Sequence, residues 1–139
     1  MWVVDSSVVI KWHIDEMDSE AAQALRYSSE RFAIPDLLFV ETANIVWKSV
    51  RRELISRLRA MQIIDSIVEG PFDVYRNQAL ARDATRIALA REITTYDASY
   101  VALAISLRTD CVTADRKLFN KLQGSPYGKH VALLADYTN

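Results

Sequence analysis

The sequence predicts a three-layer α/β/α domain in which short, mostly parallel strands form a central sheet between helices. Apolar runs of three or four residues without polar alternation recur along the chain, as is typical of strands buried on both faces of a parallel sheet. Longer segments with helical periodicity separate these runs. The chain has 139 residues, half of them apolar, which is enough for a single domain with one core.

In the N-terminal half, the pattern predicts two strands and four helices. Asp and Ser favour helix starts because their side chains cap free backbone N–H groups, and a proline in the first turn loses no hydrogen bond. Gly70-Pro71 ends the last of these helices. In order, we expect a strand over 1–4, a helix from Asp5 to about His13, a turn over 15–18, a helix over about 19–29, a strand over 32–34, a helix from Pro35 to about Arg52 and a helix over about 54–68.

The C-terminal half continues the alternation of strands and helices. Its apolar run Cys111-Val112-Thr113 indicates another strand buried on both faces. In order, we expect a short strand over 72–75, helices over about 77–90 and 96–107, a strand over 111–113, a helix over 115–122, a loop over 124–128 and a strand over 131–134 before a polar tail.

Composition excludes several classes of function. With 17 basic and 18 acidic side chains the net charge is −1, so any contact with nucleic acid must come from a local patch. Three scattered glycines cannot supply the phosphate-binding loops of ATP- or NAD-binding proteins. The single cysteine, Cys111, lies in an apolar run beside only two histidines, His13 and His130, in the whole chain, so neither a disulfide nor a structural zinc site is expected.

The chain is expected to be a cytoplasmic protein that does not enter a membrane. Its N-terminus lacks the basic region of a signal peptide, and Asp5 interrupts the apolar start. No uncharged stretch approaches the roughly 20 residues that a helix needs to cross a bilayer.

Four carboxylates, Asp5, Glu41, Asp97 and Asp115, lie beside apolar segments, where an unpaired charge is costly to bury. Asp5 and Asp115 each follow a predicted strand directly. Ligands of parallel sheets bind beyond the carboxyl ends of the strands, so these two acids are expected at one edge. A shared divalent cation would compensate the four charges, and the pattern therefore indicates a metal-dependent hydrolytic site.

Each acid also has a purely structural interpretation. Asp5 and Asp115 could cap the helices that follow them, and Asp97 fits a capping box that begins at Thr94. Glu41 lies inside a helix, on a polar stripe with Asn44, Lys48 and Arg52. This stripe is either a solvated strip or one wall of a polar pocket.

Taken together, the segments around these acids resemble the PIN-domain family of metal-dependent ribonucleases, and above all the VapC-type toxins of prokaryotic toxin–antitoxin pairs. The four family motifs correspond to Val3–Val8, Pro35–Asn44, Thr95–Ala104 and Val112–Phe119, each with one of the four acids. The likeness extends from end to end, so the resemblance implies a single PIN-like domain over residues 1–139.

The resemblance implies that the four acids are catalytic and bind Mg²⁺ or Mn²⁺, for which carboxylate oxygens are suitable ligands. Asp5 and Asp97 are expected as direct ligands, while Glu41 and Asp115 bind a second ion or hold metal waters. Ser6 and Thr113 are expected as hydroxyl partners of these ligands, and Ser7 is an open alternative to Ser6. Whether the amide of Asn44 or of Asn120 assists also stays open. The implied reaction is hydrolysis of RNA by an activated water, which leaves a 5′-phosphate and a 3′-hydroxyl.

Basic side chains are needed to hold the phosphates of RNA. The main candidates are Lys11, Arg116 and Lys117; Lys48, Arg51, Arg52 and Lys121 are further ones. For each of them, the alternative is an ordinary solvated helix face.

The resemblance also implies protein partners. A cognate VapB-type antitoxin would fill a groove beside the site, formed by the first two helices and the helix over 37–47, with Trp12 and Trp47 either as anchors or as core residues. A homodimer is favoured, and the apolar helix after Asp97 is either its contact or part of the core.

Other interpretations compete with a toxin. The fold could be a non-catalytic binding module, or a PIN nuclease of RNA processing. A phosphotransfer domain also places an Asp after its first strand. However, the haloacid-phosphatase pattern requires Asp where this chain has Ser7, and Asp115 fits the receiver pattern poorly.

Overall fold

A computed structural model of the chain describes residues 1–137, so the last two residues of the expected polar tail lie outside the described part. The strands are β1 (Trp2–Val4), β2 (Phe32–Pro35), β3 (Phe72–Tyr75), β4 (Cys111–Thr113) and β5 (Val131–Leu133). The helices are α1 (Ser6–Val9), α2 (Ser19–Arg26), α3 (Leu37–Arg51), α4 (Arg57–Val68), α5 (Asn77–Arg91), α6 (Thr95–Leu107) and α7 (Arg116–Leu122). Short 3₁₀ turns cover Ile10–Trp12, Gly128–His130 and Leu134–Asp136.

The strands form one sheet in the order β3-β2-β1-β4-β5, and every neighbouring pair is parallel. In its centre Val3 pairs with Ala33 of β2 on one side and with Cys111 of β4 on the other. The chain moves outward from β1 through β2 to β3 and then returns across the sheet to β4. The strand order therefore reverses between β1 and β4, which is where parallel α/β sheets place their ligand sites.

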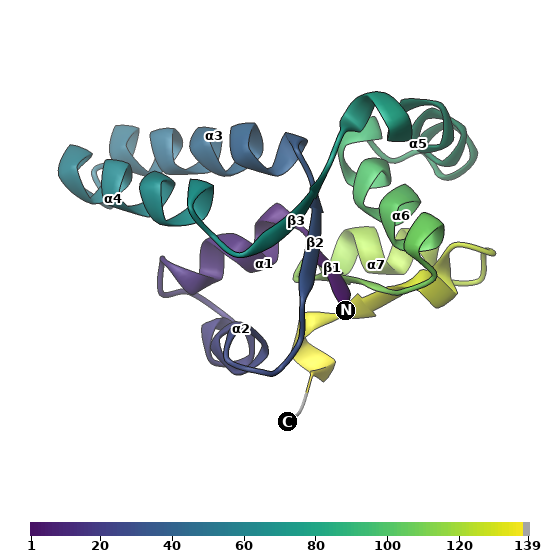
Figure 1. Cartoon of the computed structure of the whole chain (residues 1–139), viewed down its shortest axis with the longest axis horizontal. Helices are drawn as coiled ribbons and strands as arrows, with labels where there is room; N and C mark the ends of the chain where they lie inside the picture. Colours follow the sequence, from purple (N-terminus) through teal and green to yellow (C-terminus); the bar gives the residue numbers. More distant parts are fainter. Residues whose placement is uncertain (138–139) are drawn as a thin grey trace.

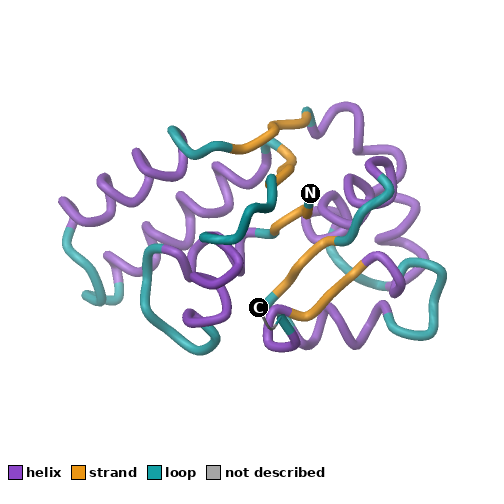
Figure 2. The backbone as a smooth tube through the Cα atoms, turned by 60° about the horizontal axis from the view of Figure 1, so that its bottom comes forward, coloured by secondary structure: helices purple, strands orange, loops and turns teal. Residues whose placement is uncertain are grey.

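Helices cover both faces of the sheet, as expected for three layers. Helices α1 to α4 lie on one side of the strands, and α5 to α7 lie on the other (Figure 1). Figure 2 shows the short strands in the middle with helices on either side of them. The three-layer α/β/α class is confirmed, and the sheet is parallel throughout.

Helix starts follow from capping side chains. Asp5, Thr94 and Asp115 are the N-caps of α1, α6 and α7, and each accepts a hydrogen bond from the backbone N–H three residues later. The capping interpretation is therefore correct for these segments. It does not exclude a role in a site, because a cap uses only one oxygen of a carboxylate.

Several element boundaries differ from the sequence-based expectation, among them the end of α2 at Arg26 rather than near residue 29. Pro35 lies in β2 opposite Tyr75 rather than in the first turn of α3. Helix α4 begins at Arg57 because Ser56 is its N-cap, and Glu53, at a φ of 59°, lies in the turn that follows α3. Helix α1 has a single turn and continues as a 3₁₀ turn to Trp12.

The core lies around α6 and the central strands. Residues Ala98 to Ala104 of α6 are all buried within the chain itself, as are Val3 and Val4 of β1. Helix α6 is therefore part of the core. Among residues 1–137, none of the helices is long and apolar enough to span a membrane.

Candidate functional site

The four predicted acids come from both helical layers and from the centre of the sheet. Asp5 follows β1 and Asp115 follows β4, at the carboxyl ends of the two strands between which the strand order reverses. Glu41 lies on α3, in one helical layer, and Asp97 lies in the first turn of α6, in the other. The fold thus directs all four toward the same edge of the sheet.

Asp97 connects the other acids electrostatically. The charge of Asp97 raises the pKa of both Asp5 and Glu41, and Asp115 raises the pKa of Asp97 itself. In each case burial makes the larger contribution. We refer to these four side chains as the acid cluster.

Asp5 is the most buried member of the acid cluster, with 5% of its surface exposed. Its Oδ1 accepts hydrogen bonds from the hydroxyl of Ser7 at 2.5 Å and from the backbone N–H of Val8 at 3.2 Å. Burial raises the pKa of Asp5 from 3.8 to about 6, although the hydrogen bonds oppose this rise. Hydrogen bonding from Thr113 also lowers the pKa of Asp5, less than burial raises it.

Glu41 is held by Tyr100. The phenol of Tyr100 on α6 donates a hydrogen bond to Oε1 of Glu41 on α3 at 2.5 Å, so it joins the two helical layers. Burial raises the pKa of Glu41, and the hydrogen bond from Tyr100 opposes this effect. Glu41 is half-buried, whereas Asn44 and Lys48 on the same stripe are exposed. At Glu41 the stripe is therefore partly buried against α6, and farther along it is solvated.

Ser7 and Thr113 link the loops that carry Asp5 and Asp115. The Ser7 hydroxyl accepts from the backbone N–H of Ala114 at 3.0 Å and lies 3.5 Å from Oγ1 of Thr113. Thr113 in turn accepts from the backbone N–H of Asp115 at 3.1 Å. These bonds hold the ends of β1 and β4 together.

Both serines after Asp5 contact the cluster, but at different acids. Ser7 binds Asp5, and hydrogen bonding from Ser6 lowers the pKa of Glu41. The role of Tyr100 could have been found from its spacing, since it lies three residues after Asp97 and therefore on the same face of α6.

The acid cluster fits a hard divalent cation by the chemistry of its donors. No three His, Cys, Asp or Glu side chains within residues 1–137 are arranged as a ready-made metal cage. Mg²⁺ does not require one, because it is commonly bound by one or two carboxylates and completes its octahedral shell with water. Oδ1 of Asp5 and of Asp115 caps a helix, which leaves the second oxygen of each for such a shell.

The basic candidates lie in different surroundings. Arg116 and Lys117 are exposed in the first turn of α7, directly after Asp115. Lys121, one turn later, lowers the pKa of Asp97 by its charge, and its Nζ donates to the carbonyl of Glu92 at 3.0 Å. Lys11 instead forms an ion pair with Glu16 at 3.0 Å.

The two tryptophans proposed as anchors have different environments. Trp12 is buried, its ring stacks against Phe72, and its Nε1 donates to the carbonyl of Ala22 at 2.9 Å, so it is a core residue. Trp47 is 55% exposed, with the guanidinium of Arg51 over its ring. It lines an apolar groove between α3 and α4.

Comparisons with known proteins are consistent with this geometry. The model of the PIN domain matches residues 2–124. Ribonuclease VapC3 of Pyrobaculum aerophilum is 32% identical over 121 residues, which cover 86% of this chain and 92% of that protein. Exonuclease VapC9 of the same organism is 32% identical over 96 residues, or 69% of this chain and 71% of that protein. A toxin–antitoxin complex from Klebsiella pneumoniae has the same fold, with a TM-score of 0.63 at 16% identity over 96% of this chain and 98% of that one.

Proposed function

The chain belongs to the PIN-domain family, and from this we propose that it is a metal-dependent endoribonuclease, a VapC-type toxin that a cognate VapB-type antitoxin neutralises. The observation that carries the proposal is the acid cluster at the point where the strand order reverses, in which Asp97 raises the pKa of Asp5 and of Glu41 and Asp115 raises the pKa of Asp97. Neighbouring carboxylates of which Asp5, Glu41 and Asp97 are at least partly buried repel one another, and a divalent cation would compensate their charge.

In this proposal Asp5 and Asp97 hold Mg²⁺ or Mn²⁺, and Glu41 and Asp115 hold a second ion or metal waters. A bound ion would lower the pKa of a coordinated water and compensate charge that develops on the phosphoryl oxygens. Tyr100 on α6 keeps the carboxylate of Glu41 on α3 oriented by its hydrogen bond.

The remaining polar side chains position these acids and the substrate. Ser7 and Thr113 fix the loops of Asp5 and Asp115, while hydrogen bonding from Ser6 lowers the pKa of Glu41. Phosphates would contact the exposed Arg116 and Lys117, whose charges lie next to the cluster at the start of α7. Lys11 stays a weaker candidate because its ammonium already pairs with Glu16.

The antitoxin is proposed to occupy the groove between α3 and α4. Its walls include Val46, Trp47 and Met61, and Arg51 and Arg57 lie at its sides. An amphipathic segment with acidic residues would match both the apolar walls and the two arginines. The fold shared with a known toxin–antitoxin complex supports an antitoxin partner.

The homodimer and the cytoplasmic location stay predictions. Because the buried face of α6 belongs to the core, a dimer would have to use another surface. Light scattering of the purified protein measures the oligomeric state, and a monomer at all concentrations would contradict the dimer.

The nuclease is tested with total RNA in Mg²⁺, in Mn²⁺ and in EDTA, with Asp97→Asn beside the wild type and Asp65→Asn, on the exposed face of α4, as a matched control. We expect discrete fragments from the wild type and the control in metal only. Fragments from Asp97→Asn as well would refute the assignment of the site. No fragments, together with no metal binding by calorimetry, would favour the non-catalytic module.

Whether cleavage is internal needs a separate substrate, because the two curated relatives are named as a ribonuclease and an exonuclease. A circular RNA has no ends, so only an endonuclease can cut it. Cleavage of linear RNA without cleavage of the circular form of the same sequence would contradict the endonuclease. An RNA-processing nuclease would be distinguished from a toxin by the absence of an antitoxin gene beside its own.

A further inference from the structure

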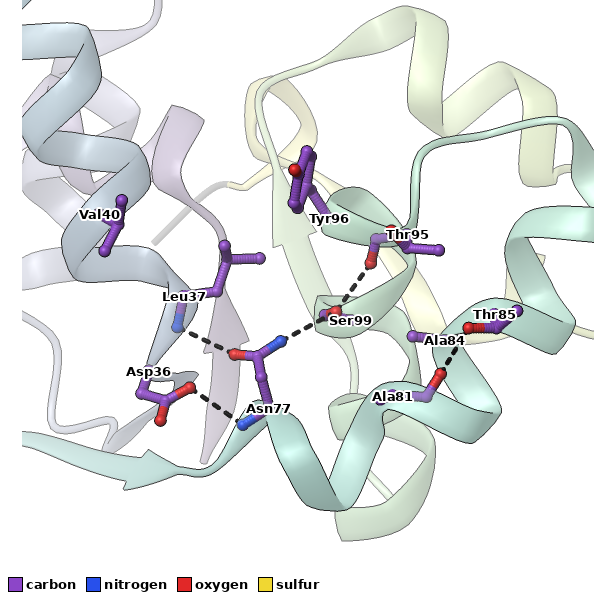
Figure 3. Close-up of a pocket in the computed structure, with 10 residues that line it drawn as sticks. All are labelled: Asp36, Leu37, Val40, Asn77, Ala81, Ala84, Thr85, Thr95, Tyr96 and Ser99. Atoms are coloured by element: carbon purple, nitrogen blue, oxygen red, sulfur yellow. Dashed lines mark hydrogen bonds between the residues drawn. The ribbon is translucent and has the colours of Figure 1, made fainter.

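A pocket of about 510 Å³ opens beside the acid cluster, between the N-terminal ends of α3, α5 and α6 (Figure 3). Leu37 and Val40 of α3 form one side, and Tyr96 of α6 stands on the other. Val40 directly precedes Glu41, and Tyr96 directly precedes Asp97. A group bound in this pocket would therefore lie next to a phosphate bound among the acids, close enough to belong to the same substrate.

The pocket is preformed by a network that joins the three helices. Oδ1 of Asn77 on α5 accepts from the backbone N–H of Leu37 at 2.9 Å, and its Nδ2 donates to Oγ of Ser99 on α6 at 3.1 Å. The Ser99 hydroxyl donates to the carbonyl of Thr95 at 2.7 Å, and Asp36 accepts from the backbone N–H of Asn77 at 2.9 Å. Because these floor groups already have partners, the pocket needs no rearrangement before a ligand binds.

The lining favours a flat, uncharged group. Among the described residues around the pocket there is no Lys or Arg, and the one charged group is the carboxylate of Asp36, which disfavours a phosphate. Tyr96 and Val40 are 59% and 70% exposed on opposite sides, so a ring could lie between apolar surfaces. The volume lies within the roughly 300–1,000 Å³ common for small-molecule sites.

We propose that this pocket binds an unpaired RNA base next to the scissile phosphate, with the ring of Tyr96 stacked on that base. The inference rests on the proposed function, since it requires an RNA substrate. Proteins read single-stranded RNA by splaying bases out onto aromatic side chains, and such stacking tolerates different bases. Asp36 adds a preference for a base that offers an amino or imino hydrogen to its second oxygen.

The first test compares Tyr96→Ala and Tyr96→Phe on a short RNA that spans a cleavage site mapped in total RNA. Tyr96→Ala should lower kcat/KM by roughly five- to 150-fold, the range expected for loss of one stacked base. Tyr96→Phe keeps the ring and should therefore lose much less of its kcat/KM than Tyr96→Ala does. Tyr27→Ala removes a tyrosine that is 79% exposed directly after the end of α2, and serves as the matched control.

The second test places an abasic nucleotide on either side of the scissile bond. For the wild type, kcat/KM on one of the two abasic RNAs should be lower than on intact RNA, by the same factor that Tyr96→Ala causes on intact RNA. Combining that RNA with Tyr96→Ala should cause no further loss, because the ring and the base contact each other. If the loss from the abasic nucleotide and the loss from Tyr96→Ala multiply, the ring and the base do not contact each other, and the inference is wrong even though RNA is cut.

Wild type and Tyr96→Ala, each with intact and with abasic RNA, are also compared by equilibrium binding in EDTA, where cleavage is not required. Weaker binding that depends jointly on Tyr96 and the base supports the pocket independently of catalysis. If Tyr96→Ala leaves RNA cleavage and RNA binding intact but weakens inhibition by the antitoxin, the pocket binds peptide and the inference is wrong. A wild type that neither cuts nor binds RNA would refute the proposed function and the pocket's role together.

Discussion

Replacing Asp5 by Asn should make the metal-free protein more stable at neutral pH and should reduce its stabilisation by metal. Asp5 is buried at the end of β1, and its carboxyl group has a pKa raised from 3.8 to about 6. The folded state therefore binds the proton more tightly than the unfolded state does. The stability that this proton provides is complete below pH 3.8 and is lost as the pH rises through about 6.

The magnitude follows from the two pKa values. The rise from 3.8 to about 6, at about 1.36 kcal/mol for each pKa unit, means that the ionised Asp5 costs the fold about 3 kcal/mol above neutral pH. Asparagine is uncharged and caps a helix about as well as aspartate, so it avoids this cost and keeps the bond from Val8. For a chain of this length the gain is at most about 10 °C in Tm.

Thermal unfolding of both proteins in EDTA, from pH 4 to pH 8, measures this effect. The excess stability of Asp5→Asn should be small at the acidic end and should grow toward neutral pH. Adding Mg²⁺ at about 100 times its Kd should stabilise the wild type by about 2.7 kcal/mol, and the variant by less. Asp65→Asn, on the exposed face of α4, should follow the wild type throughout.

Two results would refute this reasoning. If the difference in Tm between Asp5→Asn and the wild type does not change with pH in EDTA, ionisation of Asp5 does not destabilise the folded state. If Mg²⁺ stabilises both proteins equally, Asp5 does not contribute to a metal site. Either result would remove the main support for a shared cation.

Four further substitutions test other contacts. Tyr100→Phe removes the hydrogen bond that lowers the pKa of Glu41, so the acidic limb of the pH–activity profile should move to higher pH; an unmoved limb would mean that Glu41 need not ionise. Ser7→Ala leaves a backbone N–H after β4 without its partner and should cost about 1–3 kcal/mol in denaturant unfolding, with an unchanged midpoint as the contrary result. Trp12→Ala should cost about 3–5 kcal/mol because the ring is buried. Trp47→Ala should stay within about 0.5 kcal/mol and weaken antitoxin inhibition; full inhibition would exclude Trp47 as an anchor.

The order of strands and helices could be predicted because the strands are buried on both faces. Runs such as Cys111-Val112-Thr113 contain no polar alternation, which is typical of strands buried on both faces of a parallel sheet. Asp5 and Asp115 could be placed at one edge for the same reason, since each follows such a run. Predicting that these two acids lie at the same edge of the sheet required only the direction of the strands and no side-chain position.

The boundaries and the contacts between layers could not be predicted. The position of Pro35 in β2 depends on its pairing with Tyr75, which is far away in the sequence. The bond from Tyr100 to Glu41 joins residues 59 positions apart and depends on how α3 and α6 face each other. Lys11 looked available for phosphate because its pairing with Glu16 requires the loop before α2 to fold back.

The centre of the sheet is made of strands that are far apart along the chain, and this affects how the protein becomes active during synthesis. Ser7 meets the loop after β4 across 107 positions of sequence. A nascent chain that ends before residue 111 lacks β4, one of the two strands that pair with β1, and it also lacks Asp115. The acid cluster therefore stays incomplete until the ribosome has passed Asp115, however early β1 and Asp5 emerge.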